Sequence, residues 1–220
     1  MRLSIVVPAY NEARRLPATL AEISAYLEAR PQWLPAEIVV VDDGSDDATV
    51  EVATSVACGD GLSIVCRSHP RNRGKGAAVR TGFAAATGDF ILLSDADLAT
   101  PIAELEPLAA ELGRGVAVGS RAVDRSRIER RQPVYRDLMG RGFNLVVQLF
   151  ALRGIQDTQC GFKLFDGELG RRLARVQRID GFAYDVELLV LARHWGRDIR
   201  EVPVRWRHVD ESRVQPVVHS

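Results

Sequence analysis

The chain has 220 residues, of which 46% are hydrophobic and 26% charged, and its 29 basic residues balance its 29 acidic ones. This composition is that of an ordinary globular domain with room for a sizeable core, and the balanced charge argues against a nucleic-acid partner. The three cysteines follow no metal-binding or disulfide spacing, so we expect free thiols in a reducing compartment. The N-terminal apolar run stops at Pro8, too early for a signal peptide, and no stretch approaches the roughly 18 apolar residues of a membrane span.

The first 120 residues predict alternating strands and helices. Apolar, β-branched runs indicate strands over 3–7, 37–45, 62–66, 89–94 and 115–120. Helical spacing of apolar residues, or a high alanine content, predicts helices over 12–29, 74–87 and 101–112. A further helix, which carries Val50 and Val56, is predicted to be capped by Asp46. Because continuous apolar strands alternate with helices, we expect an α/β fold with a parallel sheet covered on both faces.

Residues 121–220 differ in character, and we expect them to pack on the nucleotide-binding half, 1–120, within one domain spanning 1–220. Segment 121–142 holds seven arginines against three acids, a charge that suits an anionic partner or a membrane surface. Helices are predicted over 137–152 and 181–196, and a strand over 199–207.

Polar residues follow the first, second and fourth predicted strands, in the sequences PAYNE, DDGSDD and DADLAT. The carboxyl ends of parallel strands share one edge, where α/β proteins bind ligands. Asp95 and Asp97 directly follow a buried strand, and two close carboxylates repel each other unless a cation lies between them. This D-x-D pair predicts a site for Mg²⁺ or Mn²⁺, with a solvated turn as the alternative. A dehalogenase-type phosphatase needs Thr or Val at position 99, which is Ala99.

Lys75 and Lys163 are the two lysines among the 29 basic residues, and each lies in a candidate motif. The glycines beside Lys75 match neither G-x-G-x-x-G nor a P-loop and indicate a loop-to-helix junction, although Lys75 itself is placed to meet a phosphate. Asp42 and Asp43 either cap the next helix or bind a base or ribose. The four histidines show no metal spacing, so we interpret them as structural or surface residues.

Eight segments, in order, resemble the family 2 glycosyltransferases, and more narrowly the dolichyl-phosphate (polyprenyl-phosphate) glucosyltransferases related to the dolichyl-phosphate mannose synthases. The segments are SIVVPAYNEARRL, VVVDDGSDDAT, NRGKGAAVRTGF, DADLATP, GSRA, DTQCGFKLF, DVELL and EVPVRW. The resemblance covers nearly the whole chain. It implies a GT-A (Rossmann-like), mostly parallel sheet flanked by helices on both faces. It also implies an inverting transfer of a sugar, with UDP-glucose as the expected donor, to a polyprenyl phosphate.

The resemblance further implies roles for individual residues. Asp95 and Asp97 match the metal-binding acids, and Asp97 is also expected to be catalytic. Arg121 and Arg136 match acceptor-phosphate arginines, and Arg213 matches a basic residue near the donor pyrophosphate. The residues expected to bind substrate, the first four of them around the uridine, are Pro8, Tyr10, Glu12, Asp43, Lys75, Asp95, Asp157, Gln159 and Glu187, with Asp185 nearby. Two positions depart from the mannose synthases, which carry Gln in place of Ala99 and Ser in place of Gly140.

The chemistry implied by the resemblance needs no strong general base. Negative charge develops on the departing nucleotide diphosphate, which a cation held by the acid pair stabilises, while the acceptor phosphate is already anionic. We therefore expect an enzyme that uses Mg²⁺ or Mn²⁺. From the arginine-rich segment and the lipid acceptor we expect it to be cytoplasmic and peripheral on the inner face of the cell membrane. The alternatives are a GDP-mannose-dependent polyprenyl-phosphate mannosyltransferase and a non-catalytic nucleotide-sugar-binding protein.

Overall fold

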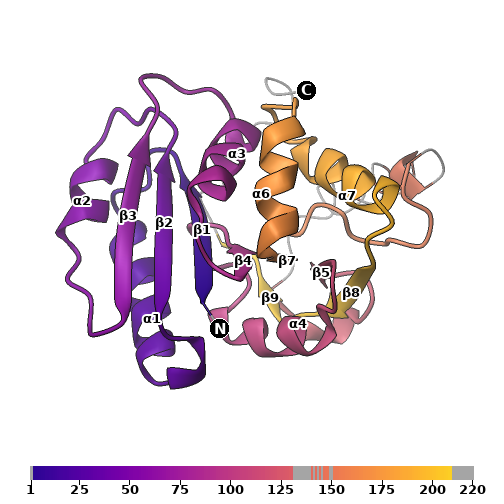
Figure 1. Cartoon of the computed structure of the whole chain (residues 1–220), viewed down its shortest axis with the longest axis horizontal. Coiled ribbons are helices and arrows are strands. Elements are labelled where there is room, and N and C mark those ends of the chain that lie inside the picture. The colour runs from indigo at the N-terminus through magenta and orange to yellow at the C-terminus, as the bar shows by residue number, and fades with distance from the viewer. Residues whose placement is uncertain are drawn as a thin grey trace.

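A seven-stranded sheet runs through the computed structural model, which describes residues 2–130, 140, 142, 144, 146–148 and 151–209 (Figure 1). The strand order is β3-β2-β1-β4-β7-β5-β8. In chain order the strands are β1 (Leu3–Ala9), β2 (Ala36–Asp42), β3 (Leu62–Ser68), β4 (Phe90–Leu93), β5 (Val116–Ser120), β7 (Lys163–Asp166) and β8 (Ile199–Pro203). Neighbouring strands are parallel except where β7 pairs with β4 and β5, so the sheet is mostly parallel, as predicted.

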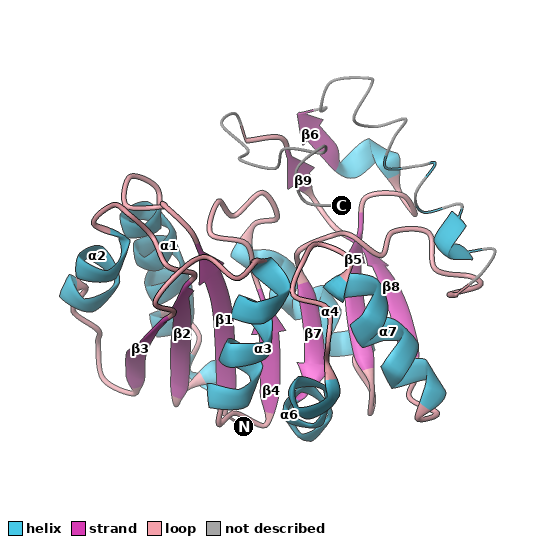
Figure 2. Cartoon of the chain, turned by 90° about the horizontal axis from the view of Figure 1, so that it is seen from above, coloured by secondary structure: helices cyan, strands magenta, loops and turns pink. Residues whose placement is uncertain are grey.

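Helices cover both faces of this sheet (Figure 2). One face carries α1 (Leu16–Glu28), α2 (Thr49–Ser55) and α4 (Leu105–Glu111), with the short 3-10 helices η1 (Pro31–Trp33) and η2 (Ile102–Glu104). The other face carries α3 (Lys75–Ala85), α6 (Gly167–Val176) and α7 (Tyr184–His194). Beyond the carboxyl ends of β5 and β8 lie η3 (Arg125–Arg127) and a two-stranded ribbon of β6 (Ile128–Arg130) and β9 (Trp206–Arg207).

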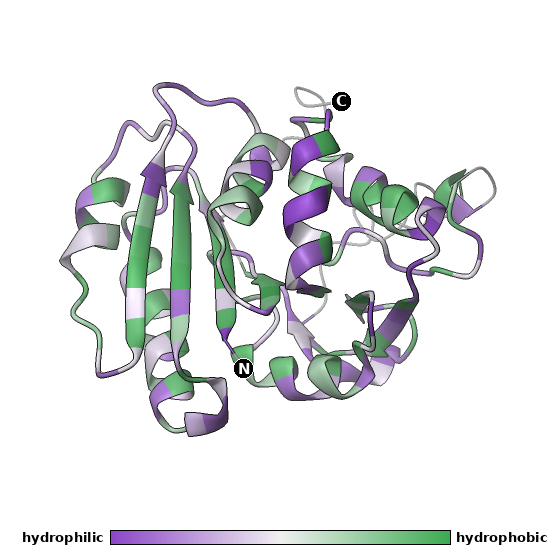
Figure 3. Cartoon of the chain, viewed as in Figure 1, coloured by the Kyte–Doolittle hydropathy of each residue, from purple (hydrophilic) through white to green (hydrophobic). Residues whose placement is uncertain are grey.

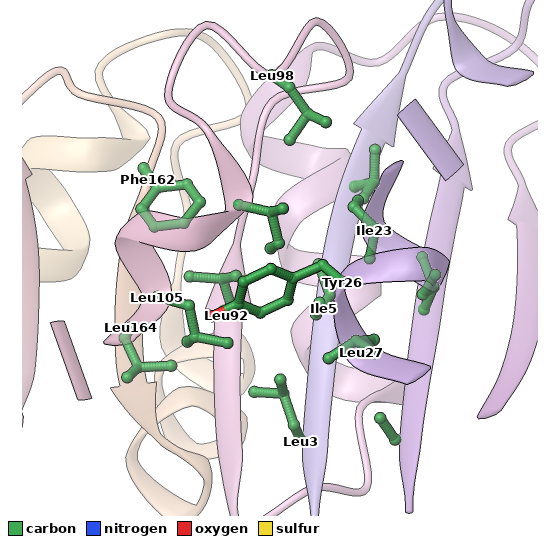
Figure 4. Close-up of a cluster of buried hydrophobic side chains, with 14 of the residues drawn as sticks. Leu3, Ile5, Ile23, Tyr26, Leu27, Leu92, Leu98, Leu105, Phe162 and Leu164 are labelled. Carbon is green, nitrogen blue, oxygen red and sulfur yellow. The ribbon is translucent and has the colours of Figure 1, made fainter. Parts of the chain in front are cut away.

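Two apolar cores hold these layers together, because each central strand buries both of its faces. Leu3 and Ile5 of β1 belong to the core under α1 and α4, whereas Val6 belongs to the core under α3 and α6. Figure 4 shows the first core, where Leu92 of β4 and Leu105 of α4 meet the β1 side chains. Along β1 and β2 most residues are hydrophobic, while hydrophilic residues gather on α6 (Figure 3). The apolar, β-branched runs therefore form buried strands, as their sequence predicted.

The predicted strands of the first half are present, but two helix starts differ from the prediction. The helix predicted from residue 12 begins at Leu16, next to Pro17, which suits a first turn. The prediction that Asp46 caps the next helix is wrong. That helix begins at Thr49, whose N–H donates to Asp47 Oδ1, while Asp46 uses its own N–H to bond Asn11.

The second half contains two elements that the sequence did not reveal. β7 inserts between β4 and β5 and runs antiparallel to both. α6 follows at once, capped by the Asp166 carboxylate, which accepts the N–H of Leu169. The predicted strand over 199–207 is interrupted after Pro203, which has no N–H for a ladder. The predicted helix over 181–196 is observed as α7, and the one over 137–152 lies largely outside the described residues.

Glu37 of β2 is a buried carboxylate that joins three segments. Its Oε1 accepts the Ser4 hydroxyl of β1 (2.5 Å), and the Thr87 N–H (2.6 Å) and hydroxyl (2.7 Å) from the turn before β4. Burial alone would raise the pKa of Glu37, but the hydrogen bonds from Ser4 and Thr87 outweigh it and hold the pKa below the ordinary value. The ionised carboxylate therefore stabilises the fold at neutral pH, and this contribution is lost as the pH falls through the lowered pKa.

We expect Glu37→Gln to lower the free energy of unfolding at pH 7 by about 1.5 kcal/mol, the order of a hydrogen bond to a charged group. The difference from the wild type should narrow on acidification, because the wild-type carboxylate then becomes protonated. Urea unfolding at pH 7 and pH 3.5 measures both values. A difference that stays constant between the two pH values would contradict this account.

Candidate functional site

The loops after β1 and β2 are bonded together at the carboxyl edge of the sheet. The N–H of Asn11 donates to Ser45 Oγ (2.8 Å), and the N–H of Asp46 donates to Asn11 Oδ1 (2.8 Å). The N–H of Glu12 donates to Thr49 Oγ1 (2.8 Å). These bonds fix the backbone of the segment that the sequence predicted to surround a uridine.

Three of the residues predicted around the uridine lie in or after the end of β1. Pro8 is a half-buried residue of that strand, and Tyr10 presents an exposed ring just beyond it. The Glu12 carboxylate is engaged by the Arg15 guanidinium, at 2.6 Å from Nε and 2.5 Å from Nη2. Tyr10 is thus the side chain of this group most open to a planar ligand.

Asp43, the fourth of these residues, is buried and bonded to protein groups through both oxygens. Oδ1 lies 2.7 Å from His69 Nδ1 and accepts the N–H of Arg73 (3.0 Å), and Oδ2 accepts the N–H of Gly74 (2.8 Å). His69 also contacts Thr81 through its other ring nitrogen (2.8 Å), so this histidine is structural, as predicted. Asp43 therefore organises the loop that leads into α3, a task the sequence did not reveal.

Asp95 and Asp97 directly follow β4, where the sequence predicted a cation site. Asp95 Oδ1 lies 2.5 Å from Lys75 Nζ, at the start of α3. The Asp95 carboxylate also lies against Gly161, where an added Cβ would come within 2.0 Å of Oδ2. Asp97 Oδ1 accepts the N–H of Ala99 (3.0 Å). Lys75 thus neutralises Asp95, whereas the hydrogen bond that Asp97 accepts from the described residues comes from a neutral amide.

The two acids experience opposite electrostatic environments. Burial would raise the pKa of Asp95, but the Lys75 ammonium outweighs it and lowers this pKa below the ordinary value. For Asp97 burial raises the pKa, and the charge of Asp95 raises it further. Asp97 therefore carries the negative charge that a bound cation would stabilise most.

The two carboxylates fit a divalent cation whose remaining ligands come from the substrate and water. Among the described residues no group of three or more His, Cys, Asp or Glu side chains could hold a metal ion. Mg²⁺ usually binds through one or two carboxylates plus substrate phosphates and water, not through an all-protein cage. Asp97, together with the Asp95 oxygen that Lys75 leaves open, would hold such an ion.

A second, fully buried ion pair lies behind Asp95. Lys163 of β7 donates from Nζ to the Asp185 carboxylate of α7 and to the Cys160 carbonyl (2.6 Å). The Cys160 carbonyl belongs to the turn that continues into Gly161, so this pair supports the backbone against which Asp95 packs. Both lysines that the sequence singled out therefore pair with aspartates at this site.

Arg121, just beyond β5, is held in one orientation by Asp157. Its Nε and Nη2 lie 2.7 and 2.8 Å from the two Asp157 oxygens, and its N–H donates to the same carboxylate (3.0 Å). The guanidinium also lies 5.4 Å from the centre of the Trp206 ring. Burial would raise the pKa of Asp157, but the charge of Arg121 lowers it. Asp157 thus positions Arg121, and it also accepts the N–H of Gln159 (3.2 Å).

The remaining predicted site residues are Glu187, Arg136 and Arg213. The Glu187 carboxylate accepts the N–H groups of Arg178 and Ile179 (both 2.8 Å), so it holds the loop after α6. Arg136 and Arg213 lie outside the described residues.

The architecture is the GT-A (Rossmann-like) glycosyltransferase fold, as solved structures indicate. Glucosyl-3-phosphoglycerate synthase from Mycobacterium tuberculosis, in complex with UDP, superposes with a TM-score of 0.67 and 22% identity, over 98% of this chain and 73% of that one. The mannosyltransferase PcManGT from Pyrobaculum calidifontis, in complex with GDP-Man and Mn²⁺, gives a TM-score of 0.63 and 21% identity, over 96% and 58%.

The sequence comparisons are more specific. Residues 4–173 match the family described as glycosyl transferase family 2. The dolichyl-phosphate beta-glucosyltransferase of Drosophila melanogaster is 40% identical over 98% of this chain and 70% of its own length. The human enzyme of that name is 39% identical over the same shares, and the Saccharomyces cerevisiae one is 33% identical over 99% and 70%. The chain therefore belongs to glycosyl transferase family 2.

We expect Gly161→Ala to disturb the candidate metal site without unfolding the protein. The added methyl group would collide with Asp95 Oδ2, so the carboxylate must shift away from its place beside Lys75. Apparent Mn²⁺ affinity, measured from the metal dependence of donor binding, should fall by about tenfold, as for other changes behind a metal ligand. Gly59→Ala is the matched control, because its methyl group meets only the flexible end of Glu28. Equal Mn²⁺ affinity in the two variants would count against the proposed role of Asp95.

Proposed function

We propose that this protein is a divalent-cation-dependent, inverting glycosyltransferase that moves glucose from UDP-glucose to a polyprenyl phosphate of the dolichyl type. The observation that carries the proposal is the pair Asp95 and Asp97 at the carboxyl end of β4, with Arg121 fixed at the end of β5. Asp95 and Arg121 are close enough for each charge to shift the pKa of the other group. The names of the curated relatives support glucose as the sugar and dolichyl phosphate as the acceptor.

On the donor side, the chain supplies oxygen ligands for a cation and side chains that are held in place by their neighbours. Asp97 and Asp95 would hold Mg²⁺ or Mn²⁺, which, when bound, stabilises the charge that develops on the departing diphosphate. Lys75 and the Gly161 backbone keep Asp95 in place. Tyr10 offers an exposed ring for the uracil, on a loop already fixed by hydrogen bonds.

On the acceptor side, the chain orients a nucleophile that needs no activation. A phosphate oxygen of the acceptor attacks C1 of the sugar while the bond from C1 to the UDP oxygen breaks, and the configuration at C1 inverts. Because the acceptor phosphate is anionic at neutral pH, no proton has to be removed. Arg121, held by Asp157, positions that phosphate and so lowers the entropic cost of the encounter. Arg136 and Arg213 are further predicted contacts of the acceptor and donor phosphates.

We further propose that residues 1–220 form one domain that works as a peripheral protein on the cytoplasmic face of the cell membrane. Strands β7 and β8 of the second half lie in the same sheet as β1 to β5, which supports a single unit. In the part of the chain that the structure describes, no helix combines the length and apolarity needed to cross a membrane. A GDP-mannose-dependent mannosyltransferase is the second candidate, because a GDP-Man complex is among the similar structures.

Transfer of radiolabelled glucose from UDP-glucose to dolichyl phosphate in detergent tests the proposal. We expect Mn²⁺- or Mg²⁺-dependent transfer that exceeds transfer from GDP-mannose and disappears with a chelator. Asp97→Asn should lower the rate by about a thousandfold, the order of losing one electrostatic group that acts on the developing charge, with an unchanged melting temperature. Asp60→Asn, a change at an exposed loop acid, is the matched control. The absence of transfer from any UDP- or GDP-sugar would exclude the enzymatic proposal.

A further inference from the structure

The end of α6 and the loop after it expose arginines and apolar side chains side by side in the sequence. Arg175 and Arg178 are exposed, and their guanidinium groups make no hydrogen bond or ion pair with other described residues. Val176 and Ile179 are each 38% exposed, which is unusual for large apolar side chains in this protein. None of these four side chains serves the donor or acceptor site described above.

A pocket of about 440 Å³ opens beside these residues. Its lining consists of Arg80, Ala174, Arg175, Gln177, Arg178 and Asp180. Arg80 lies 2.6 Å from the Asp180 carboxylate and donates to the Gln177 carbonyl (3.3 Å), so it is a fixed part of the wall. Three guanidinium groups against one carboxylate leave an excess of positive charge, which suits a phosphate.

Gln177 is a fixed, buried part of this lining. The side chain is buried, and its Nε2 donates to the carbonyls of Gly76 (2.7 Å) and Ile179 (3.0 Å), which fixes the orientation of the amide. Its Oε1 is buried without a hydrogen-bond partner among the described residues. Because this oxygen has almost no accessible surface, Gln177 only braces the pocket wall, and the exposed arginines supply the groups that can reach a ligand.

The loop beside the pocket is bonded to the start of α3. The Asp180 carbonyl accepts the N–H of Gly76 (2.7 Å), and the preceding residue, Lys75, pairs with Asp95. The pocket, whose lining also includes Arg80 further along α3, is therefore connected to the acid pair through the first turn of this helix.

We propose that residues 175–179, with Arg80, form a docking surface for the bilayer that binds an anionic phospholipid. The arginines bind the lipid phosphate, and Val176 and Ile179 enter the apolar boundary. This inference rests on the proposed function, since an enzyme with a lipid acceptor needs its active edge at the membrane. It assigns that contact to a surface separate from the arginine-rich segment 121–142.

Vesicle co-sedimentation tests the docking surface. The full chain is mixed with vesicles of phosphatidylcholine alone, or of phosphatidylcholine with phosphatidylglycerol or with the same charge of phosphatidylserine. We expect binding to both anionic vesicles and not to phosphatidylcholine alone, and a loss of about tenfold or more in Arg175→Gln/Arg178→Gln, because each basic residue contributes separately near an anionic surface. Arg2→Gln/Arg114→Gln removes the same charge near the amino ends of β1 and β5 and should bind as the wild type does.

Equal binding of the wild type and Arg175→Gln/Arg178→Gln would overturn the docking surface, and so would equal binding of the wild type to neutral and anionic vesicles. Binding of glycerol 3-phosphate in solution without binding to vesicles would show that the pocket takes a soluble anion instead. The detergent transfer assay separates this inference from the proposed function, because the double variant should keep wild-type transfer there. Arginine-dependent vesicle binding without any transfer would leave the surface standing and refute the glycosyltransferase proposal.

Discussion

The close spacing of two half-buried carboxylates at the carboxyl end of β4 is the constraint on which this site depends. Asp95 and Asp97 are one residue apart, and the fold neutralises them unequally. Lys75 pairs with Asp95, whereas burial and the neighbouring charge leave Asp97 with a raised pKa. The imbalance costs stability in the free protein, and a bound cation would remove it. Under the proposed function, the sheet edge would therefore favour a cation together with an anionic diphosphate.

Both halves of the chain contribute charged groups to this edge. The first half supplies the acid pair, the loops fixed around Asn11, and Lys75 at the start of α3. The second half supplies β7, whose buried Lys163 supports the backbone beside Asp95, and the Asp157 carboxylate that holds Arg121. Carboxylates suit a donor that arrives with a cation, and a guanidinium suits an acceptor phosphate, so under the proposed function this arrangement would bring together two reactants that otherwise repel each other.

Sequence alone predicted the parts of this protein that depend on local pattern. Strands β1 to β5 are apolar runs, and the acid pair was found because it follows one of them directly. β7 was missed because it begins with a lysine, which is buried only because Asp185 pairs with it from another element. The resemblance suggested that Glu187 binds substrate. In the structure its carboxylate instead accepts backbone N–H groups, and such partners cannot be read from a sequence pattern. The sequence therefore did not predict contacts of charged side chains with groups far away in the chain.

Calorimetric titration with UDP, in the presence and absence of Mn²⁺, measures most directly whether the acid pair couples a cation to a diphosphate. The account predicts that Mn²⁺ strengthens UDP binding to the wild type by about tenfold or more, a coupling free energy of about 1.4 kcal/mol, and that Asp97→Asn abolishes the effect. Identical UDP affinity with and without Mn²⁺ in the wild type, or an unchanged Mn²⁺ effect in the variant, would contradict it.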